Sequence, residues 1–407
     1  MKIAIVSDMH LGYERFAADT YAQAKEALEK AAAVADMIIM PGDIFDKRFP
    51  RPDVLAQGFN MFRDLSRKEW KARVTGFDSK SSKAFTDVPV IAIPGTHERT
   101  SIGKENPLNL LSIAGLLVDT SEATTTVEKD GERVSVFGMG GVSEELVRQK
   151  LAELAPEPVS GAFNIFMFHQ SIYELLPFSE DFIHFEELPK GFDLYVDGHI
   201  HNKLIAKVHG KKFIIPGSTV LTQLKDDEQD QKGFFLFNTA SYSEQFIPIN
   251  SRPFKSLHIR FSGATPSEIE SGCDAAIKGA VEELRDSSGR IPIVRLVVEG
   301  TAAKGLGASD LLLNALAKRY SEKAILSIDV SRLESPEVAM SIDGVRNSRL
   351  GGMPIKELGL AMFAKRLKEL GYGGSDAAEL FVILSSEGSK EKVLKEAEKH
   401  LEEGAQQ

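Results

Sequence analysis

The chain has 407 residues, of which 43% are hydrophobic and 27% are charged, a length and composition that suit two or three globular domains. Aspartate and glutamate (59) outnumber lysine and arginine (49), which gives a net charge of −10 and excludes a surface that attracts nucleic acid over its whole extent. Any attraction for DNA must therefore come from a local basic patch, a bound metal or a partner.

Residues 1 to about 250 alternate strand patterns with helical patterns. Strands are predicted at 2–7, within 36–43 and within 88–95, and helical patterns lie at 20–35 and 53–66. Further apolar runs lie at 133–139, 163–168, 193–197, 203–208, 212–216 and 233–237. Strands separated by helices, followed by hairpin-like strands, favour an α/β fold with a layered β-sandwich core flanked by helices.

The remaining chain predicts a small α+β domain over 251–332, a linker over 333–355 and a helical region over 356–407. In the small domain, strand patterns at 254–261, 292–298 and 324–330 alternate with helical patterns at 266–285 and 309–320. The linker contains Pro, Ser, Gly and Arg with little periodicity. In the last region Leu360, Phe363 and Leu367 share one helical face.

The expected compartment follows from cysteine usage and from the apolar runs. Cys273 is the only cysteine, so no disulfide can form within the chain and a reducing compartment is expected. The first apolar run reaches Asp8 and is too short for a signal peptide. No run approaches the roughly 18 apolar residues of a membrane span, so we expect a cytoplasmic or nucleoid-associated protein without membrane contact.

Histidine and acidic side chains follow five of the predicted strands, at the point where each strand ends. They are Asp8 and His10 after the first, Asp43 and Asp46 after the second, His97 and Glu98 after the third, His169 after the fourth, and His199 and His201 after the fifth. In open α/β sheets, functional sites form beyond the carboxyl ends of the strands. Imidazole and carboxylate ligands without thiolate suit Mn, Fe or Zn better than Ca or Mg.

The spacing of these residues predicts a site for two metal ions. In Asp-x-His and His-x-His, residues two apart in extended backbone point to the same side. Two cations about 3.5–4 Å apart activate a water and stabilise the attacking and leaving oxygens of a displacement at phosphorus. Asp43 is the candidate bridge between them. The predicted ligands are Asp8, His10, Asp43, His169, His199 and His201.

These five motifs, in this order, resemble those of the calcineurin-like metallophosphoesterase superfamily. Within it, the chain is similar to the Mre-eleven (SbcD-like) DNA double-strand-break repair nucleases. The similar segments are Asp8-Met-His10-Leu-Gly-Tyr, Gly42-Asp43-Ile-Phe, Pro107-Leu-Asn-Leu-Leu, Gly198-His199-Ile-His201, Pro216-Gly217-Ser218 and Lys232-Gly233-Phe234. The resemblance covers the first 250 residues by motif and the rest of the chain by layout.

The resemblance implies a role for each motif residue. One divalent metal would be held by Asp8, His10, Asp43 and His201, and the other by Asp43, His169 and His199. His97 would stabilise the transition state or protonate the leaving oxygen. The family prefers manganese, and its members degrade duplex DNA ends and nick single strands or hairpins. The chain is therefore expected to be a metal-dependent exo- and endonuclease.

The resemblance also implies partners. Helices near 53–66 and 107–117 would form a homodimer, residues 251–332 would be a cap domain that contacts DNA, and the C-terminal helices would bind a Rad-fifty-type ABC ATPase. The chain has no Gly-x-x-x-x-Gly-Lys-Ser/Thr loop. Hydrolysis of ATP would therefore be the task of that partner.

Two motif positions depart from the family pattern. Thr96 stands where the family has an asparagine that ligates the second metal, and its hydroxyl is a shorter and weaker ligand. Asp46 stands where the family often has a catalytic histidine; its carboxylate could tune a metal or a neighbouring histidine. The next acid, Glu98, is expected to orient His97 or to cap the following segment. The two departures are expected to change the rate and the metal preference relative to the family pattern.

Two other functions remain open on the sequence. A phosphodiesterase for small nucleotides would have a narrow pocket, although residues 333–407 have no clear purpose in such an enzyme. A scaffold that binds DNA and the ATPase but cleaves poorly would explain Thr96 and Asp46. The basic residues beside the motifs are Lys47, Arg48, Arg51 and Arg99. They form either a solvated surface or a local patch that contacts phosphate.

Overall fold

The structure is a computed structural model that describes residues 1–79, 86–99, 105–284, 290–303 and 313–334, with helical residues at 359–360, 363–364, 367–368 and 377–384. The chain separates into two compact units. The first contains Met1–Ser256, Gly279–Arg295 and Tyr320–Ser327, and the second contains Leu257–Lys278, Leu296–Arg319 and the described residues from Ile328 on. The domain boundaries predicted near 250 and 332 stay predictions.

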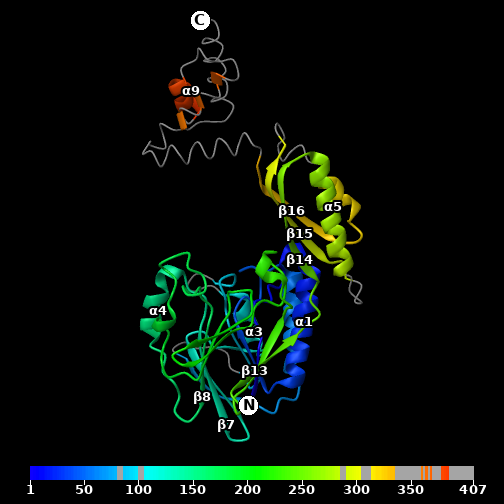
Figure 1. Ribbon diagram of the computed structural model, residues 1–407. Helices are drawn as coiled ribbons and strands as arrows, with labels where there is room; N and C mark the ends of the chain where they lie inside the picture. Colours follow the sequence, from blue (N-terminus) through cyan, green and yellow to red (C-terminus); the bar gives the residue numbers. More distant parts are fainter. Residues whose placement is uncertain are drawn as a thin grey trace. The chain divides into compact units, whose positions relative to one another are not determined.

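Two sheets form the centre of the first unit (Figure 1). The six-stranded sheet has the order β13 (Ser243–Pro248), β12 (Gly233–Asn238), β1 (Lys2–Ile5), β2 (Met37–Pro41), β4 (Val90–Ile93) and β5 (Val118–Asp119). The seven-stranded sheet has the order β10 (Leu204–Val208), β11 (Lys211–Ile215), β9 (Leu194–Asp197), β8 (Phe163–Phe168), β7 (Glu132–Met139), β6 (Ala123–Lys129) and β3 (Arg73–Ser79). The layered β-sandwich predicted from the apolar runs is confirmed.

Side chains alternate between two cores along the central strands. Ile3 and Ile5 of β1 pack into the core between the sheets, where they meet Ile165 of β8. Ala4 of the same strand points to the opposite face and joins a core beneath the helices, and Phe166 of β8 does so on the far side of the second sheet. Because successive strand residues face opposite ways, strands that are buried on both faces appear as continuous apolar runs.

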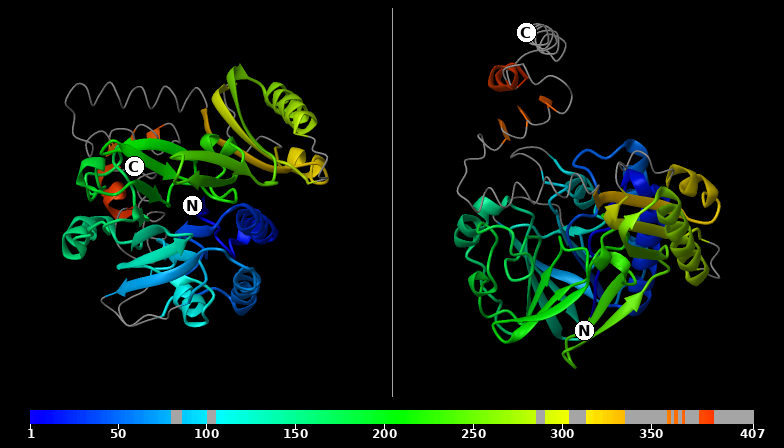
Figure 2. Two further views of the ribbon diagram at one scale, coloured as in Figure 1. Left: turned by 90° about the horizontal axis from the view of Figure 1, so that it is seen from below. Right: turned by 45° about the horizontal axis from the view of Figure 1, so that its top comes forward.

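Helices cover the outer faces of both sheets. The helices of this unit are α1 (Ala17–Val34), α2 (Pro52–Ser66), α3 (Pro107–Ile113) and α4 (Val147–Leu154), with short 3-10 turns η1 (Glu14–Phe16), η2 (Glu144–Leu146), η3 (Phe185–Glu187) and η4 (Asp226–Gln229). α1 and α4 lie on opposite sides of the pair of sheets in all views (Figures 1 and 2). On α1, small residues such as Ala24 and Ala31 are fully buried and let the helix approach the six-stranded sheet closely.

A third sheet is formed by the strands predicted in the small domain. It has the order β14 (Phe254–Ala264), β15 (Ile293–Ala302) and β16 (Ile325–Glu334). Helices α5 (Pro266–Glu283) and α6 (Leu313–Arg319) connect these strands in sequence. The order of elements is therefore as predicted, and the observed strands extend a few residues beyond the predicted ends.

The C-terminal predictions fall mostly on residues outside the described part of the chain. The predicted linker, 333–355, is described only at its first two residues. In the predicted helical region, α9 (Ala377–Leu384) is described, and its Leu380 packs with Leu367 and Phe363. Within the described residues, no helix combines the length and the apolar character needed to cross a membrane.

Candidate metal centre

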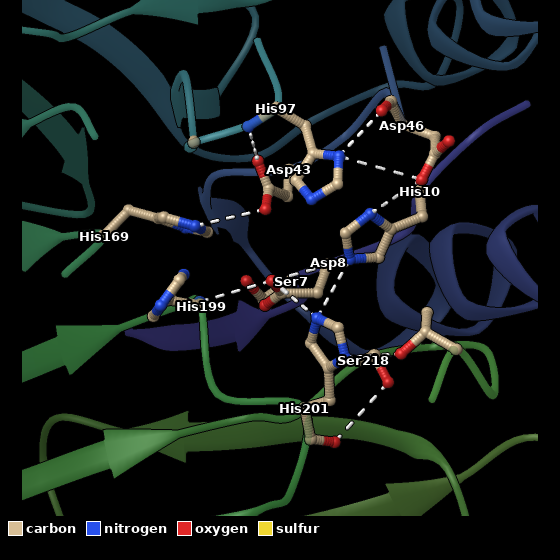
Figure 3. Close-up of polar contacts among 12 residues, drawn as sticks. Ser7, Asp8, His10, Asp43, Asp46, His97, His169, His199, His201 and Ser218 are labelled. Atoms are coloured by element: carbon tan, nitrogen blue, oxygen red, sulfur yellow. Dashed lines mark hydrogen bonds and ion pairs between the residues drawn. The ribbon is translucent and has the colours of Figure 1, made fainter. Parts of the chain in front are cut away.

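The seven side chains predicted for the site come together at one end of the two sheets (Figure 3). β1, β2 and β4 run parallel to one another, and so do β8 and β9, so that the loops after them meet. Asp8 and His10 follow β1, Asp43 follows β2, His97 follows β4, His169 follows β8, and His199 and His201 follow β9. The strand-end pattern thus identified side chains that are neighbours in space.

The backbone of several of these residues adopts a left-handed conformation. The φ angle is 49° at Asp8, 46° at His10, 49° at Asp43 and 69° at His199. Such angles cost about 1–3 kcal/mol each in a residue with a side chain, and they concentrate at functional sites. The fold therefore gives up stability at several of the predicted ligands to aim their side chains inward.

Glycines let the chain approach these ligands closely. A Cβ atom on Gly95 would lie 2.2 Å from Asp43 Oδ1, and one on Gly198 would lie 2.1 Å from the carbonyl oxygen of Pro41. Both distances are far below van der Waals contact, so any side chain at these positions would displace a ligand loop. The two glycines are thus required by packing around Asp43 and His169.

One group of potential ligands contains Asp8, His10 and His201. The Nε2 atoms of the two histidines lie 3.0 Å apart, and each lies 3.9 Å from Asp8 Oδ1. The ligand atoms of the three residues are all within 4.8 Å of one another. Two imidazole nitrogens and a carboxylate oxygen that converge in this way can share one cation.

A second group contains Asp8, Asp43 and His169. His169 Nε2 lies 3.2 Å from Asp43 Oδ2, and its Nδ1 donates a hydrogen bond of 2.7 Å to the carbonyl oxygen of Pro41. The ring of His199 lies edge-on to that of His169, with centroids 5.2 Å apart. Asp8 belongs to both groups, whereas Asp43 was predicted as the bridge; that assignment stays a prediction.

His97 lies beside these groups and is held by Asp46. His97 Nδ1 donates a hydrogen bond of 2.7 Å to the backbone oxygen of Asp46. The Asp46 carboxylate lies 3.8 Å from that nitrogen and 3.5 Å from His10 Nδ1. His97 also donates its backbone N–H to Asp43 Oδ1 at 2.9 Å, and 46% of its side chain is exposed. Asp46 is thus placed to influence a neighbouring histidine, one of the roles expected for it.

The chemistry of the group fits bound cations. Asp8 Oδ2 is buried and accepts no hydrogen bond within the described residues, and His169 Nε2 likewise makes none. An unsatisfied buried polar atom costs about 1–3 kcal/mol, so such atoms call for an explanation. A divalent cation would satisfy both, because carboxylate oxygen and neutral imidazole nitrogen are its usual ligands.

The electrostatics of the site favour the ligand form of two histidines. Burial lowers the pKa of His199 to about 4 and holds the pKa of His201 well below its usual value, so both rings are neutral near pH 7. Burial also disfavours the charged form of His169, but the carboxylates of Asp43 and Asp8 outweigh it and raise the pKa of His169 to about 10. Binding of a cation to His169 would therefore displace a proton from its imidazole ring.

Two residues that the sequence analysis missed orient His201. Thr222 Oγ1 accepts a hydrogen bond of 2.6 Å from His201 Nδ1 and donates one of 3.1 Å to Glu228 Oε1. Glu228 is buried and also accepts the backbone N–H of Gln223 at 2.8 Å. This series of hydrogen bonds places the His201 proton on Nδ1, so Nε2 has no proton and is directed toward Asp8. The sequence around Glu228 is rich in acidic residues, so nothing in it distinguished Glu228 as a residue that orients a histidine.

Replacing Thr222 by valine is expected to weaken cation binding at His201. Valine keeps the shape of threonine but cannot accept the Nδ1 proton, and loss of such an orienting group typically costs about 10- to 100-fold in metal affinity. Calorimetric titration with Mn²⁺ measures the change. Thr222→Ser is the matched control and should bind like the wild type. Equal affinities for the valine and serine variants would contradict the role of the hydroxyl.

Of the two roles predicted for Glu98, orienting His97 is wrong, and capping the next segment involves residues 100–104, which lie outside the described part of the chain. Its buried carboxylate accepts the backbone N–H of Gly95 at 3.0 Å and that of Phe45 at 2.9 Å. It therefore joins the loop after β4 to the loop after β2 instead of orienting His97. Burial raises the pKa of Glu98 to about 7.

Comparisons with known proteins agree with this geometry. The calcineurin-like phosphoesterase family matches residues 1–203. The DNA double-strand break repair protein Mre11 of Archaeoglobus fulgidus is 24% identical, with 99% of this chain and 90% of that protein covered. For the Mre11 protein of Methanopyrus kandleri the values are 23%, 85% and 83%, and for that of Saccharolobus solfataricus they are 24%, 79% and 81%. The chain therefore belongs to the calcineurin-like phosphoesterase family, whose members use divalent metal ions, and it is an Mre11-type member of that family.

Proposed function

We propose that the protein is a nuclease that hydrolyses phosphodiester bonds in DNA with two bound divalent cations, most suitably Mn²⁺, as a subunit of a double-strand-break repair complex. The carrying observation is that two groups of ligands, Asp8–His10–His201 and Asp8–Asp43–His169, meet at Asp8. Such adjacent groups suit two cations close together. The names of the similar Mre11 proteins support DNA as the substrate.

The proposed ligands form two sets, one for each cation. Following the family resemblance, Asp8, His10, Asp43 and His201 would hold one ion, and Asp43, His169 and His199 the other. Within these sets, the ligand atoms of Asp8, His10 and His201 converge, as do those of Asp43 and His169 with Asp8. When bound, the pair would lower the pKa of a water and stabilise negative charge on the phosphate oxygens. The hydrogen bonds from His169 to Pro41 and from His201 to Thr222 fix the ring orientations beforehand, which reduces the cost of assembling the site.

His97 is suited to moving a proton at the leaving oxygen. Its Nδ1 proton is donated to the Asp46 backbone oxygen, so Nε2 is the ring atom left for the substrate. The side chain is half-exposed, as required of a group that must reach a DNA strand. A histidine so placed can act as a general acid, and such catalysis contributes typically about 10²–10⁴-fold.

The proposal includes a homodimer and an ATPase partner. α2 and α3 are the helices proposed for the dimer, and Leu110 and Ile113 of α3 expose apolar surface there. The C-terminal helices are proposed to bind a Rad50-type ATPase. The described helix α9, with the apolar sequence Ala-Ala-Glu-Leu-Phe-Val-Ile-Leu, is suited to packing against another helix.

The function is tested by supplying Mn²⁺ to the purified protein with linear duplex DNA, single-stranded DNA, a hairpin and bis(p-nitrophenyl) phosphate. Cleavage of DNA that stops when the metal is chelated is the expected result. If every DNA stays intact, with and without the ATPase, while the small ester is hydrolysed, the nuclease proposal fails. The phosphodiesterase for small nucleotides would then be the better hypothesis.

Replacing Thr96 by asparagine is expected to strengthen the second cation site. Thr96 occupies the position of the family's asparagine ligand, and its side chain is exposed. An amide oxygen reaches farther than a hydroxyl, and a gain of about 1.4 kcal/mol would tighten binding tenfold. Mn²⁺ stoichiometry and kcat are measured together, with Thr96→Val as the control that supplies no oxygen. If the asparagine variant has the same Mn²⁺ stoichiometry and the same kcat as the wild type, the second cation site is not weakened by Thr96. The scaffold hypothesis then loses its support from this residue.

A further inference from the structure

Phe49 presents an aromatic ring to solvent three residues after Asp46. Its relative exposure is 68%, and among the described phenylalanines only Phe178 is also classed as exposed, at 82%. Large aromatic side chains are ordinarily buried, since each can remove 150–250 Å² from water. The exposed ring of Phe49 is not needed for the core of the fold and is available to a ligand.

The chain around Phe49 is stiff. The sequence Phe49-Pro50-Arg51-Pro52 leads directly into α2, which begins at Pro52. Each proline fixes its own φ near −65° and restricts the residue before it to extended conformations. Phe49 and Arg51 are both such residues. A ring held on a stiff segment loses little conformational entropy when a ligand stacks on it.

Three basic residues stand beside Phe49 in the chain. Lys47, Arg48 and Arg51 are exposed, within two positions of Phe49 in the chain. Lys47 lies 2.5 Å from Glu14 and Arg51 lies 3.0 Å from Asp53. These pairs lie on the surface, where an ion pair is worth little, so a phosphate can take the place of either acid. An exposed aromatic ring with basic residues one and two positions away in the chain suits a nucleic-acid strand, in which each flat base lies beside a phosphate.

The segment is attached to the metal centre through Asp46. The backbone oxygen of Asp46 accepts the hydrogen bond from His97, and its carboxylate lies beside His10. Phe49 is three residues farther along the chain, so its Cα lies at most about 11 Å from that of Asp46, given the reach of about 3.6 Å per residue. That span corresponds to about three nucleotides at the rise of 3.4 Å per nucleotide in duplex DNA.

We propose that Phe49 stacks on an unpaired base within a few nucleotides of the cleaved phosphate, and that Lys47, Arg48 and Arg51 contact the neighbouring phosphates. The inference rests on the proposed nuclease function and names the form of DNA bound beside the site. Bases inside a duplex are already stacked on one another and offer no free face to a side chain. The segment 47–52 therefore favours a single-stranded or frayed end over an intact duplex.

The test uses single-stranded oligonucleotides in which one base after another near the cleaved bond is replaced by an abasic residue. For the wild type, loss of the base that stacks on Phe49 should raise KM by about 5- to 150-fold, the range that base–aromatic stacking supports. Phe49→Ala should raise KM for the intact oligonucleotide by a similar factor and should no longer respond to that abasic position. Phe49→Trp should restore the response.

Three controls separate stacking from other effects. Phe178→Ala removes the other exposed phenylalanine and should behave like the wild type. Hydrolysis of bis(p-nitrophenyl) phosphate by Phe49→Ala should keep its kcat, which shows that the metal centre is intact. A Phe49→Ala enzyme with wild-type KM and an unchanged abasic response would overturn the stacking role while the nuclease function stands. A wild type that hydrolyses the small ester but no oligonucleotide would overturn the nuclease function itself.

Discussion

Replacing Asp43 by asparagine is expected to abolish tight cation binding and to lower kcat on phosphodiesters by at least about 10³-fold. Asparagine keeps the size of aspartate and can still accept the backbone N–H that His97 donates to Oδ1. It removes the negative charge that faces His169 Nε2 at 3.2 Å. Cations in such sites supply several kcal/mol of transition-state stabilisation, and each 1.36 kcal/mol is tenfold in rate.

Two measurements check this expectation. Calorimetric titration with Mn²⁺ gives affinity and stoichiometry, and the rise in Tm on adding Mn²⁺ reports binding to the folded state. Asp36→Asn is the matched control, because Asp36 precedes β2 and Asp43 follows it. Asp36 is paired with Lys129 at 2.9 Å, away from the site, and its loss should leave kcat unchanged. If Asp43→Asn keeps both ions and its rate, the proposed bridge is wrong.

Much of the fold could be predicted because its central strands are buried on both faces. The patterns at 163–168 and 193–197 correspond to β8 and β9 within one residue. β3 and β6 were not predicted. β6 has the sequence Ala-Thr-Thr-Thr-Val-Glu-Lys, in which polar threonines face both sides of the sheet and hide the apolar pattern of a strand. β3 lies at the edge of the sheet and contains the charged residues Arg73 and Asp78. At the edge of a sheet, pairing and not an apolar run decides the structure.

The candidate site could be predicted as a set of residues but not as a network. Parallel strands bring their carboxyl ends together, so motifs at strand ends become neighbours without any knowledge of side-chain contacts. The contact of Thr222 with His201, however, joins residues 21 positions apart through a loop, and Glu98 bonds to Phe45, which is 53 positions away. Such pairs depend on loop conformations, including the left-handed angle at Asp43, that no periodicity encodes.

Replacing His97 by asparagine is expected to lower kcat on DNA by about 10²–10⁴-fold, the usual contribution of a general acid, while cation binding stays intact. The asparagine amide can still donate to the Asp46 backbone oxygen as Nδ1 does at 2.7 Å, but no group replaces Nε2. His97 is not among the proposed ligands, so Mn²⁺ stoichiometry should be that of the wild type. His184→Asn, which removes a partly exposed histidine 3.3 Å from Glu174, is the control.

The choice of substrate distinguishes the two roles proposed for His97. A sugar alkoxide leaves only when protonated, whereas p-nitrophenolate is stable as an anion and needs little help. If His97 protonates the leaving oxygen, His97→Asn should lose far more activity on DNA than on bis(p-nitrophenyl) phosphate. If it stabilises charge on the phosphate oxygens instead, both substrates should lose activity equally. Loss of one bound Mn²⁺ would contradict both roles and would make the ring a ligand together with His10 and Asp46, since the ligand atoms of the three residues lie within 4.8 Å of one another.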